Sequence, residues 1–429
     1  MNSNDIYVSL DIGTSTVKVV IGEMTGDSLN VIGIGKSESS GIKKGSIIDI
    51  DDTVHSIQQA VEQAERMVGM KIRSVVVGIT GNHIQLQDCH GVVAVSSPNR
   101  EIGNEDIARV LEAAQVIPLA PEREIIDCIP HQFIVDGLEE IKDPRGMVGV
   151  RLEVEGTIIT GSKTVLHNLL RCVEKAGLDV LDVVLQPLAL GSIALTRDEK
   201  NLGVLLLDIG GGSTNVAYFE EGILMSTFVL PIGGNHITKD ISIGLRTPTE
   251  EAEIIKLKHG HAFIDQASVE ETFSVSKLGG TSKQTFTQQD LAYIIEPRVA
   301  EIFELVAAEM GRMGVLDLPG GLILTGGVTA MPGVIELAQH EFQNNVRIAI
   351  PDYIGVREPQ YTSAIGLIKF AYHNVKVQGK ELVKAVEVEH QQKVPSAAKQ
   401  RPASSSDKPL KDKSGVTKRV KDWLGLFFD

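Results

Sequence analysis

The sequence predicts an α/β protein made of two similar halves, with a small inserted module and a tail of different composition. Residues 7–18 and 202–216 share one pattern, in which an apolar strand ends on Asp-Ile-Gly, a small polar turn follows and a second strand begins. Around both stretches, segments whose apolar residues have the spacing of a strand alternate with segments that have the spacing of a helix, which is typical of a sheet covered by helices. A third glycine motif, at residues 322–334, follows another apolar strand and precedes a helix.

The composition excludes several classes of protein. A chain of 429 residues with 42% apolar side chains can fold as two or more domains. The net charge of −15 argues against nucleic acid as a general partner, although residues 393–429 carry nine basic and four acidic side chains, a local charge of +5. The three cysteines show no metal or disulfide spacing, and no segment resembles a signal peptide or a membrane-spanning helix. We therefore expect a soluble protein of a reducing cytoplasm, or one attached to a membrane from its cytoplasmic side.

The two repeated stretches contain the residue types of a phosphate site. In the central copy, the buried strand over residues 204–207 delivers Asp208 to the edge of the sheet. Glycines after it let backbone N–H groups approach an anion closely. Asp208 can hold a divalent metal, through water because Mg²⁺ gives up its waters reluctantly. The N-terminal copy repeats this order from Asp11. A glycine-rich hairpin that only turns a sheet explains either copy alone, but two facing hairpins would hold the phosphates of one nucleotide between them.

Together with the third motif, these stretches resemble the phosphate-1, phosphate-2 and adenosine motifs of the actin/Hsp70/sugar-kinase superfamily. The resemblance implies ATP and Mg²⁺ as cofactors, with Asp11 and Asp208 at the metal and in the catalytic set. The implied nucleotide contacts come from all three motifs: Gly13, Thr14, Ser15, Thr16, Lys18, Gly210, Gly211, Gly212, Ser213, Gly326, Gly327 and Met331.

The first half opens with three strands over residues 5–37. A helix over residues 51–68 follows, which Asp51 or Asp52 can cap, and then a buried strand over residues 75–79.

Residues 84–161, the inserted module, then interrupt the α/β alternation. We expect a strand, a helix capped by Asn104 and two further strands, over residues 84–95, 105–115, 123–135 and 150–159. A variable surface insertion is the alternative to a functional role.

The α/β pattern resumes with a helix over residues 163–176 and a strand over 178–185. Gln186 follows this strand directly, before a helix over residues 188–195. In actin-like ATPases this segment supplies the residue that orients the attacking water, so the resemblance places Gln186 in the catalytic set. A helix-capping glutamine is the alternative.

Residues 239–314 are richer in polar side chains and begin with a helix over 249–260. By resemblance to bacterial actins, Glu253 and Lys256 on this helix face the ribose and base; a solvated helix face is the competing interpretation.

Three further helices complete this part of the chain. A long helix over residues 287–313 contains Pro297, which should kink or break it. Pro332 fits the first turn of the helix after the third glycine motif, and a final helix is expected over residues 360–371.

The composition changes at residue 379. Proline, serine and mixed charges predict a disordered linker over residues 379–413, followed by an amphipathic helix over 414–429. This helix is too short and charged to span a bilayer but can lie in the interface of an anionic membrane; docking in a partner's groove is the alternative. Its membrane-facing side chains are Val416, Val420, Trp423, Leu424, Phe427 and Phe428.

Taken together, these features resemble one family, the bacterial cell-division FtsA proteins. The features that carry the similarity are the actin-like core, the Asp-Pro-Arg-Gly-Met stretch at residues 143–147, Gln186-Pro187 and the tethered C-terminal helix. The resemblance implies an actin-like two-domain ATPase fold with two ribonuclease-H-like halves. Its subdomains would be 1A (1–83, 162–200 and 363–378), 1C (84–161), 2A (201–238 and 315–362) and 2B (239–314).

The same resemblance implies a function. Members polymerise in actin-like fashion on the cytoplasmic face of the cell membrane at the division septum. They tether filaments of the tubulin-like FtsZ there, helping to assemble the septal ring and recruit later division proteins, which are expected to bind 1C. The C-terminal peptide of FtsZ would bind 2B, where Arg298 is the expected contact.

Three other classes of protein are rivals to this interpretation. A weak ATPase acting as a structural anchor is expected, and the alternative is a cell-shape-determining bacterial actin without an FtsZ-tethering role. A chaperone would need a further substrate domain after the core, and no motif indicates the sugar pocket of a kinase.

Overall fold

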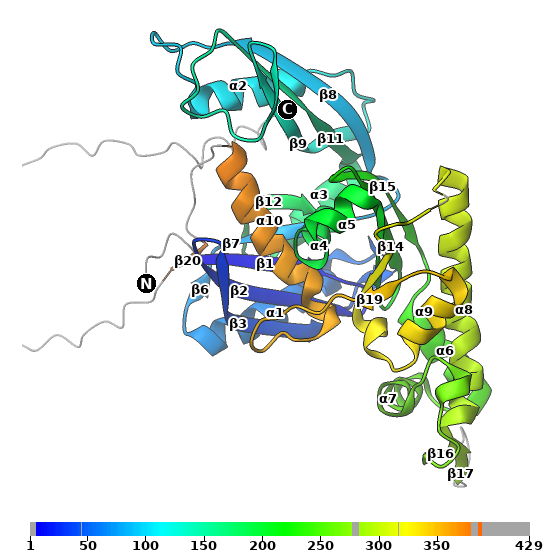
Figure 1. Ribbon diagram of the computed structural model, residues 1–429. Helices are drawn as coiled ribbons and strands as arrows, with labels where there is room; N and C mark the ends of the chain where they lie inside the picture. Colours follow the sequence, from blue (N-terminus) through cyan, green and yellow to red (C-terminus); the bar gives the residue numbers. More distant parts are fainter. Residues whose placement is uncertain (1–5, 44, 277–282, 316, 379–384, 388–429) are drawn as a thin grey trace, which may run out of the picture. The chain divides into compact units, whose positions relative to one another are not determined.

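The computed structural model describes residues 6–43, 45–276, 283–315, 317–378 and 385–387. Two five-stranded sheets form its centre (Figure 1). The first has the order β12-β7-β1-β2-β3 and the second the order β15-β14-β13-β18-β19. The first sheet consists of β1 (Ile6–Ile12), β2 (Thr16–Thr25), β3 (Ser28–Glu38), β7 (Ser74–Ile79) and β12 (Asp179–Leu185). The second consists of β13 (Val204–Ile209), β14 (Thr214–Glu220), β15 (Ile223–Leu230), β18 (Leu322–Thr325) and β19 (Val346–Ile348).

The two sheets share one topology. In each, three consecutive strands run antiparallel, and the first of the three pairs in parallel with a later strand, β7 or β18. The register is also shared, because Asp11 lies opposite Lys18 in one hairpin and Asp208 lies opposite Asn215 in the other. The predicted duplication is therefore present in the backbone, residue for residue, at the aspartates.

Helices cover both faces of each sheet. The first sheet packs against α1 (Ile50–Val68) and α3 (Lys163–Lys175) on one face, and against α4 (Gln186–Ala194) and α10 (Thr362–Gln378) on the other. The second sheet packs against α6 (Gly234–Leu245), α8 (Gln288–Met313) and α9 (Val334–Phe342). Ala189 of α4 belongs to the core of the first sheet, while Leu190 and Ala194 pack against the second. Helix α4 therefore connects the two cores, and its start carries Gln186.

The ends of several elements differ from the sequence predictions. Helix α1 begins one residue before Asp51, and its cap is Asp49, whose side chain accepts a hydrogen bond from the backbone N of Asp52. Pro332 precedes helix α9, because Gly333 takes a left-handed conformation with φ of 86° at its N-cap. Pro297 does not break helix α8, which continues through it. Helix α10 extends to Gln378, seven residues beyond the predicted end.

The inserted module forms an antiparallel sheet of order β10-β9-β11-β8 with one helix. Its elements are β8 (Gln85–Ala94), α2 (Asn104–Ala114), β9 (Arg123–Val135), β10 (Leu138–Ile141) and β11 (Arg151–Ser162). Strand β10 was not predicted. Helix α2 approaches the sheet closely at Gly91, where a Cβ would lie 2.4 Å from the carbonyl oxygen of Val110.

The N-cap of α2 is Gly103, and the predicted cap Asn104 is the first helical residue. The carboxylate of Asp106 completes this helix start by accepting hydrogen bonds from the backbone N–H groups of Gly103 and Ser96 and from Arg109. Burial alone would raise the pKa of Asp106, but these hydrogen bonds outweigh it and lower the pKa to about 2.

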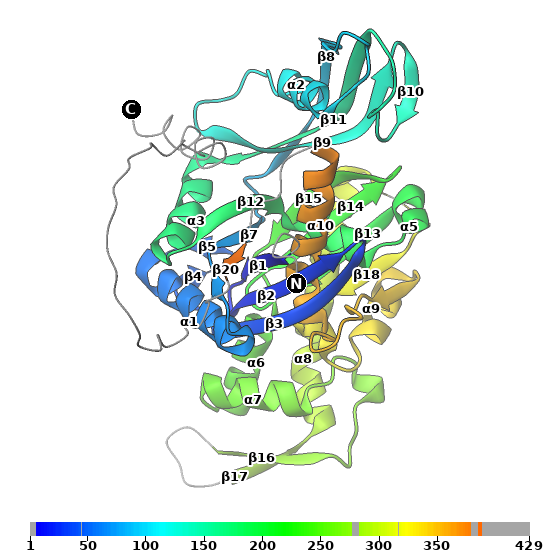
Figure 2. The same ribbon diagram turned by 90° about the vertical axis from the view of Figure 1, so that its left-hand side faces the viewer.

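The end of α10 contacts the inserted module. The guanidinium of Arg145 donates to the carbonyl oxygens of Lys376 and Val377 at 2.6 and 2.9 Å. The carboxylate of Asp127 accepts from the side-chain amides of Asn374 and Gln378 at 2.9 and 3.1 Å. Figure 2 shows α10 running from the first sheet to this module. The contact thus joins the module to the helix that covers the first sheet.

The remaining elements are short or lie on the second half. They are β4 (Ile42–Lys43), β5 (Ser46–Ile47), β6 (Lys71–Ile72), α5 (Arg197–Leu202), α7 (Thr249–His259), η1 (Ile264–Gln266), β16 (Thr272–Ser276), β17 (Lys283–Thr287), η2 (Gly327–Ala330), η3 (Pro359–Tyr361) and β20 (Val386–Glu387).

Strand β20 corrects the predicted linker, which was expected to be disordered from residue 379. The strand pairs antiparallel with β6, Ala385 is fully buried, and its carbonyl oxygen accepts from the backbone N–H groups of Arg73 and Ser74. The amphipathic helix predicted over residues 414–429 lies outside the described residues. Within the described part of the chain, no helix is long and apolar enough to cross a membrane.

Candidate functional site

The candidate site lies where the two duplicated hairpins face each other. The N-terminal loop (residues 13–15) and the central loop (residues 210–213) close with equivalent hydrogen bonds, from Gly13 N to Thr16 O at 3.1 Å and from Gly210 N to Ser213 O at 3.0 Å. The next backbone N–H groups donate to no other group of the described residues; they belong to Thr14, Ser15, Gly211 and Gly212. Unpaired amides on tight glycine loops are the usual donors to phosphate oxygens.

The two loops are in direct contact. A Cβ on Gly211 would lie 1.9 Å from Oγ of Ser15, and one on Gly212 would lie 2.4 Å from Cγ2 of Thr14. The hydroxyl of Ser15 also donates to Oδ1 of Asn235, at the start of α6, at 3.0 Å. Glycine is therefore required at residues 211 and 212 because only a backbone without side chains fits between the halves.

Each loop follows an aspartate whose partners fix its carboxylate. Oδ2 of Asp11 lies 3.3 Å from Nζ of Lys18, and its Oδ1 accepts from Nε2 of Gln186 at 2.9 Å. Oδ2 of Asp208 accepts from Nδ2 of Asn215 at 3.2 Å. Burial, and then the neighbouring charge of Asp11, raise the pKa of Asp208 to about 6. The two carboxylates therefore lie close enough to repel each other.

This charge arrangement fits a divalent cation. Two carboxylates face one side-chain cation, Lys18, so an added positive charge between them would relieve their repulsion. Among the described residues, no group of three or more His, Cys, Asp or Glu side chains could enclose a metal ion. A site with only two carboxylates suits Mg²⁺, which retains several waters when bound.

The third glycine motif joins the same site. Gly326 has a φ of 93°, and a Cβ there would lie 2.4 Å from Oδ1 of Asp208. Both features require glycine beside the carboxylate. Gly327 begins η2, and Met331 follows that helix, with its Cε 3.3 Å from the Cβ position of Gly260.

Glu253 and Lys256 of α7 lie beside this region but contact each other. Nζ of the buried Lys256 lies 2.6 Å from Oε2 of Glu253, 2.8 Å from Oγ1 of Thr238 and 3.2 Å from the carbonyl oxygen of Gly234. The amine also lies 3.5 Å from the Cβ position of Gly234, next to Val328. Lys256 therefore does not lie on a solvated helix face.

Gln186 is buried as the first residue of α4, with its amide against Asp11. Both predicted catalytic residues of the first half are thus in contact. The only described side chains that hydrogen-bond the carboxylates of Asp11 and Asp208 are Lys18, Gln186 and Asn215. The two amides cannot accept a proton, and Lys18 is ion-paired with Asp11.

Three site residues were missed from the sequence. A Cβ on Gly78 would lie 2.7 Å from Cγ of Gln186, so this glycine makes room for the glutamine. Asn215 holds Asp208 and accepts from Thr80 Oγ1 at 3.2 Å, across the two halves. Asn235 joins α6 to the N-terminal loop. Only Asn215 had a sequence signal, because it occupies the place of Lys18 in the repeated pattern.

Arg298 lies near the middle of α8 and is already ion-paired. Its Nε lies 2.6 Å from Oδ2 of Asp240, and its NH1 bonds Glu301. The hydrogen bond with Asp240 raises the pKa of Arg298 above its usual range. A cavity of about 330 Å³ opens beside it, lined by Asp240, Ile294, Pro297, Arg298 and Glu301.

Comparison with known proteins identifies the family. A family model for "Cell division protein FtsA" matches residues 205–366, and one for "SHS2 domain inserted in FTSA" matches residues 81–160. Cell division protein FtsA of Bacillus subtilis (strain 168) is 63% identical over 382 residues, which cover 89% of this chain and 87% of that protein. The chain belongs to the FtsA family. FtsA of Escherichia coli (strain K12) is 35% identical over 85% of this chain and 90% of its own length.

Solved structures with little sequence similarity share the fold. The PilM–PilN complex of type IV pilus biogenesis matches with a TM-score of 0.57 at 17% identity, over 84% of this chain and 97% of that one. MreB5 of Spiroplasma citri bound to ADP matches with a TM-score of 0.54 at 12% identity, over 88% and 98%. The predicted actin-like fold and the predicted role as an FtsA cell-division protein are thus confirmed, and nothing favours the cell-shape alternative.

Proposed function

We propose that this FtsA chain binds ATP and Mg²⁺ between its two loops and acts as a nucleotide-dependent anchor for FtsZ filaments. The observation that carries the nucleotide proposal is the facing pair of loops, each with unpaired amides and a preceding aspartate. The backbone N–H groups of both loops would bind phosphate oxygens, and Lys18 and Ser213 would add side-chain donors. Gly327, Met331, Glu253 and Lys256 would border the base and ribose.

Asp11 and Asp208 would hold Mg²⁺ through water, and the ion would supply positive charge to the phosphates. Gln186 would orient a water molecule from its position against Asp11. The one carboxylate that contacts this glutamine, Asp11, would be committed to Mg²⁺ and Lys18 and so would be a poor general base. We therefore expect turnover well below the range of metabolic kinases, roughly 1–100 s⁻¹. The chain would then act as an assembler rather than as an enzyme.

The test of nucleotide binding is calorimetry on Gly211→Asp, with Asp208→Ala as a second variant. A Cβ at residue 211 would lie only 1.9 Å from Oγ of Ser15. The aspartate would therefore push the two loops apart, and ATP binding should be lost. Gly311→Asp is the matched control, because Gly311 in α8 has nothing within 4 Å of its Cβ position. Unchanged ATP affinity in folded Gly211→Asp would refute the site.

The C-terminal peptide of FtsZ would bind residues 239–314, the predicted 2B, at the cavity beside Arg298. Arg298 must exchange Asp240 and Glu301 for the acidic groups of the peptide, so the surrounding acids would make the binding moderate and salt-dependent. Arg298→Glu should abolish peptide binding and leave ATP binding intact. Arg312→Glu, on the same helix with a Glu309 partner, is the control. Equal peptide affinity in Arg298→Glu would place the peptide elsewhere.

Attachment to the cytoplasmic side of the membrane at the septum would come from residues 414–429, and stable attachment would need several copies along a self-assembled polymer. Trp423→Glu, or removal of residues 415–429, should release the protein from anionic liposomes without altering ATP binding. Equal co-sedimentation of the shortened chain would exclude this segment as the anchor. Later division proteins would bind the inserted module.

A further inference from the structure

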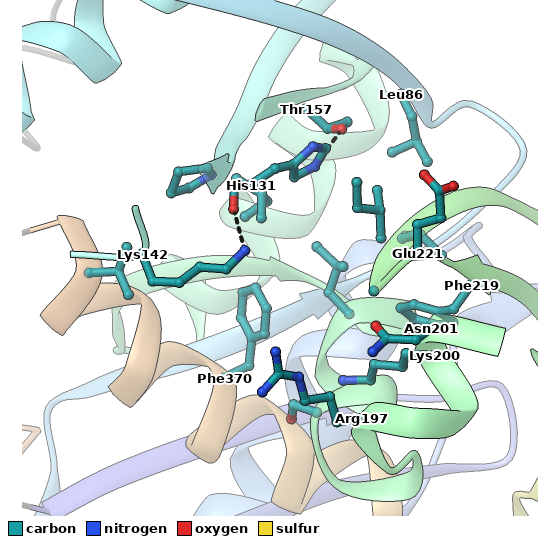
Figure 3. Close-up of a pocket in the computed structure, with 18 of the residues that line it drawn as sticks. Leu86, His131, Lys142, Thr157, Arg197, Lys200, Asn201, Phe219, Glu221 and Phe370 are labelled. Carbon is teal, nitrogen blue, oxygen red and sulfur yellow. Dashed lines mark hydrogen bonds between the residues drawn. The ribbon is translucent and has the colours of Figure 1, made fainter. Parts of the chain in front are cut away.

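A cavity of about 660 Å³ lies outside the proposed nucleotide and FtsZ sites. One wall comes from strands β9 and β11 of the inserted module, and the others from α4, α5, α10 and the turn between β14 and β15 (Figure 3). None of its lining residues belongs to the N-terminal or central loop. Its volume is typical of sites for small organic ligands, which often form between domains.

Most of the cavity is apolar. Its partly exposed apolar side chains are Leu86, Ile129, Leu188, Ile223 and Phe370. Phe133 and Phe219 lie behind them, almost fully buried. Such a surface favours an apolar or aromatic ligand body, which gains free energy by leaving water.

The polar groups at the cavity are mainly basic. Lys142 lies on one side, and Arg197 and Lys200 lie together on the opposite side (Figure 3). Within the described residues, none of the three forms an ion pair with a carboxylate. Among the residues that the structure describes, Glu221 is the one acidic side chain in the lining. The described lining therefore combines a single carboxylate with three cations that form no ion pair, of which Lys142 and Arg197 are exposed to solvent and Lys200 is partly buried.

Lys200 is the most constrained of these cations. Its amine lies 5.9 Å from the ring centroid of Phe219, and burial lowers the pKa of Lys200. Lys142 donates to the carbonyl oxygen of His131 at 2.9 Å, which holds the amine over the cavity. An anion between the two sides would supply the counter-charge that the protein lacks here.

We infer that this cavity binds a small amphipathic anion, with an apolar or aromatic body against the phenylalanines and a carboxylate, sulfonate or phosphate group between Lys142, Arg197 and Lys200. The ligand would contact the inserted module on one side and helices α4, α5 and α10 on the other. Its binding would therefore stabilise the packing of the module against these helices.

The test uses two dyes with the same apolar body. 1-Anilinonaphthalene-8-sulfonate carries the anion, and N-phenyl-1-naphthylamine lacks it. Fluorescence titration of the full chain should show tighter binding of the sulfonate. The double variant Arg197→Gln/Lys200→Gln should weaken the sulfonate by at least about tenfold, the loss of one charged hydrogen bond, and leave the neutral dye unchanged. Lys239→Gln, an exposed lysine on α6, is the matched control and should change neither.

Two more variants keep the test decisive. Lys142→Gln, on the opposite side, should weaken the sulfonate independently if the double variant fails to fold. Ser192→Trp places a large side chain in the cavity from α4 and should remove both dyes. Undiminished sulfonate binding in the Gln variants, an equal loss in Lys239→Gln, or retention of both dyes by Ser192→Trp would overturn the proposal.

Discussion

Removing Arg145 should loosen the end of α10. Its guanidinium donates two hydrogen bonds to the last carbonyls of that helix, and also bonds Asn104 at 2.7 Å and Asp143 at 2.8 Å. In Arg145→Ala the carbonyls of Lys376 and Val377 lose a charged donor and must be solvated by water.

The magnitude follows from those contacts. A hydrogen bond from a charged group contributes about 1.5–3 kcal/mol, and a cation at a helix C-terminus adds about 0.3–1 kcal/mol. One nitrogen, Nη2, donates both bonds, so we count them as a single charged hydrogen bond. Because Arg145 also keeps some exposure to solvent, the lower end applies, and we expect the last turn of α10 to open about 2 kcal/mol more easily. That change corresponds to roughly thirty-fold faster local exchange.

Hydrogen–deuterium exchange read by mass spectrometry on peptides covering residues 362–378 measures this opening. Arg145→Lys should lie between wild type and Arg145→Ala, because lysine keeps the charge but loses the forked donor. Arg312→Ala, which removes an exposed arginine of α8 with one Glu309 contact, should leave α10 unchanged. Wild-type exchange rates at α10 in Arg145→Ala would show that this arginine does not hold the helix end.

Three further predictions concern other parts of the chain. Gly78→Ala should lower ATP turnover but not ATP affinity, because a Cβ 2.7 Å from Cγ of Gln186 must displace the Gln186 amide. Turnover assays measure the first quantity and calorimetry the second. Unchanged turnover would contradict the role of Gln186. Asp106→Asn should destabilise the inserted module by up to about 2.4 kcal/mol at pH 7. Since folding lowers the pKa of Asp106 to about 2, this difference should be complete above the unfolded pKa near 4 and shrink as the pH falls below it; amide exchange in α2 that differs equally at pH 7 and pH 3 would disagree. Ala385→Glu should expel β20 and expose to exchange the amides of Arg73 and Ser74, which donate to the carbonyl oxygen of Ala385. Continued protection of these two amides would argue against that strand.

The sequence was sufficient where the candidate site is built from short contiguous patterns. Asp11 and Asp208 with their glycine loops could be predicted because each hairpin is made by neighbouring residues, and the repeat doubles the signal. The two halves and the inserted module could be predicted from the alternation of strand-like and helix-like spacings of apolar residues along the chain.

Contacts between distant segments could not be predicted. Gly78 matters only because Gln186, 108 positions later in the sequence, folds against it, and Asn235 matters only because α6 meets the N-terminal loop. Strand β20 is two residues long within a sequence of linker composition, and its pairing with β6 is non-local. The N-caps of α1 and α2 lie one to three residues before the predicted ones for a related reason. Several polar side chains near a helix start can accept the cap hydrogen bond, and packing decides where the helix begins.

The two hairpins, though duplicated, differ in charge at one equivalent position. Opposite Asp11 stands the amine of Lys18, while opposite Asp208 stands the neutral amide of Asn215. A molecule lying between the loops therefore meets an electrical gradient, with a compensated carboxylate on one side and an uncompensated one on the other. A phosphate chain has its own gradient, since charge is concentrated at its terminal group. One difference between the two copies of the repeated motif can thus make the two ends of a nearly symmetric site electrically unequal.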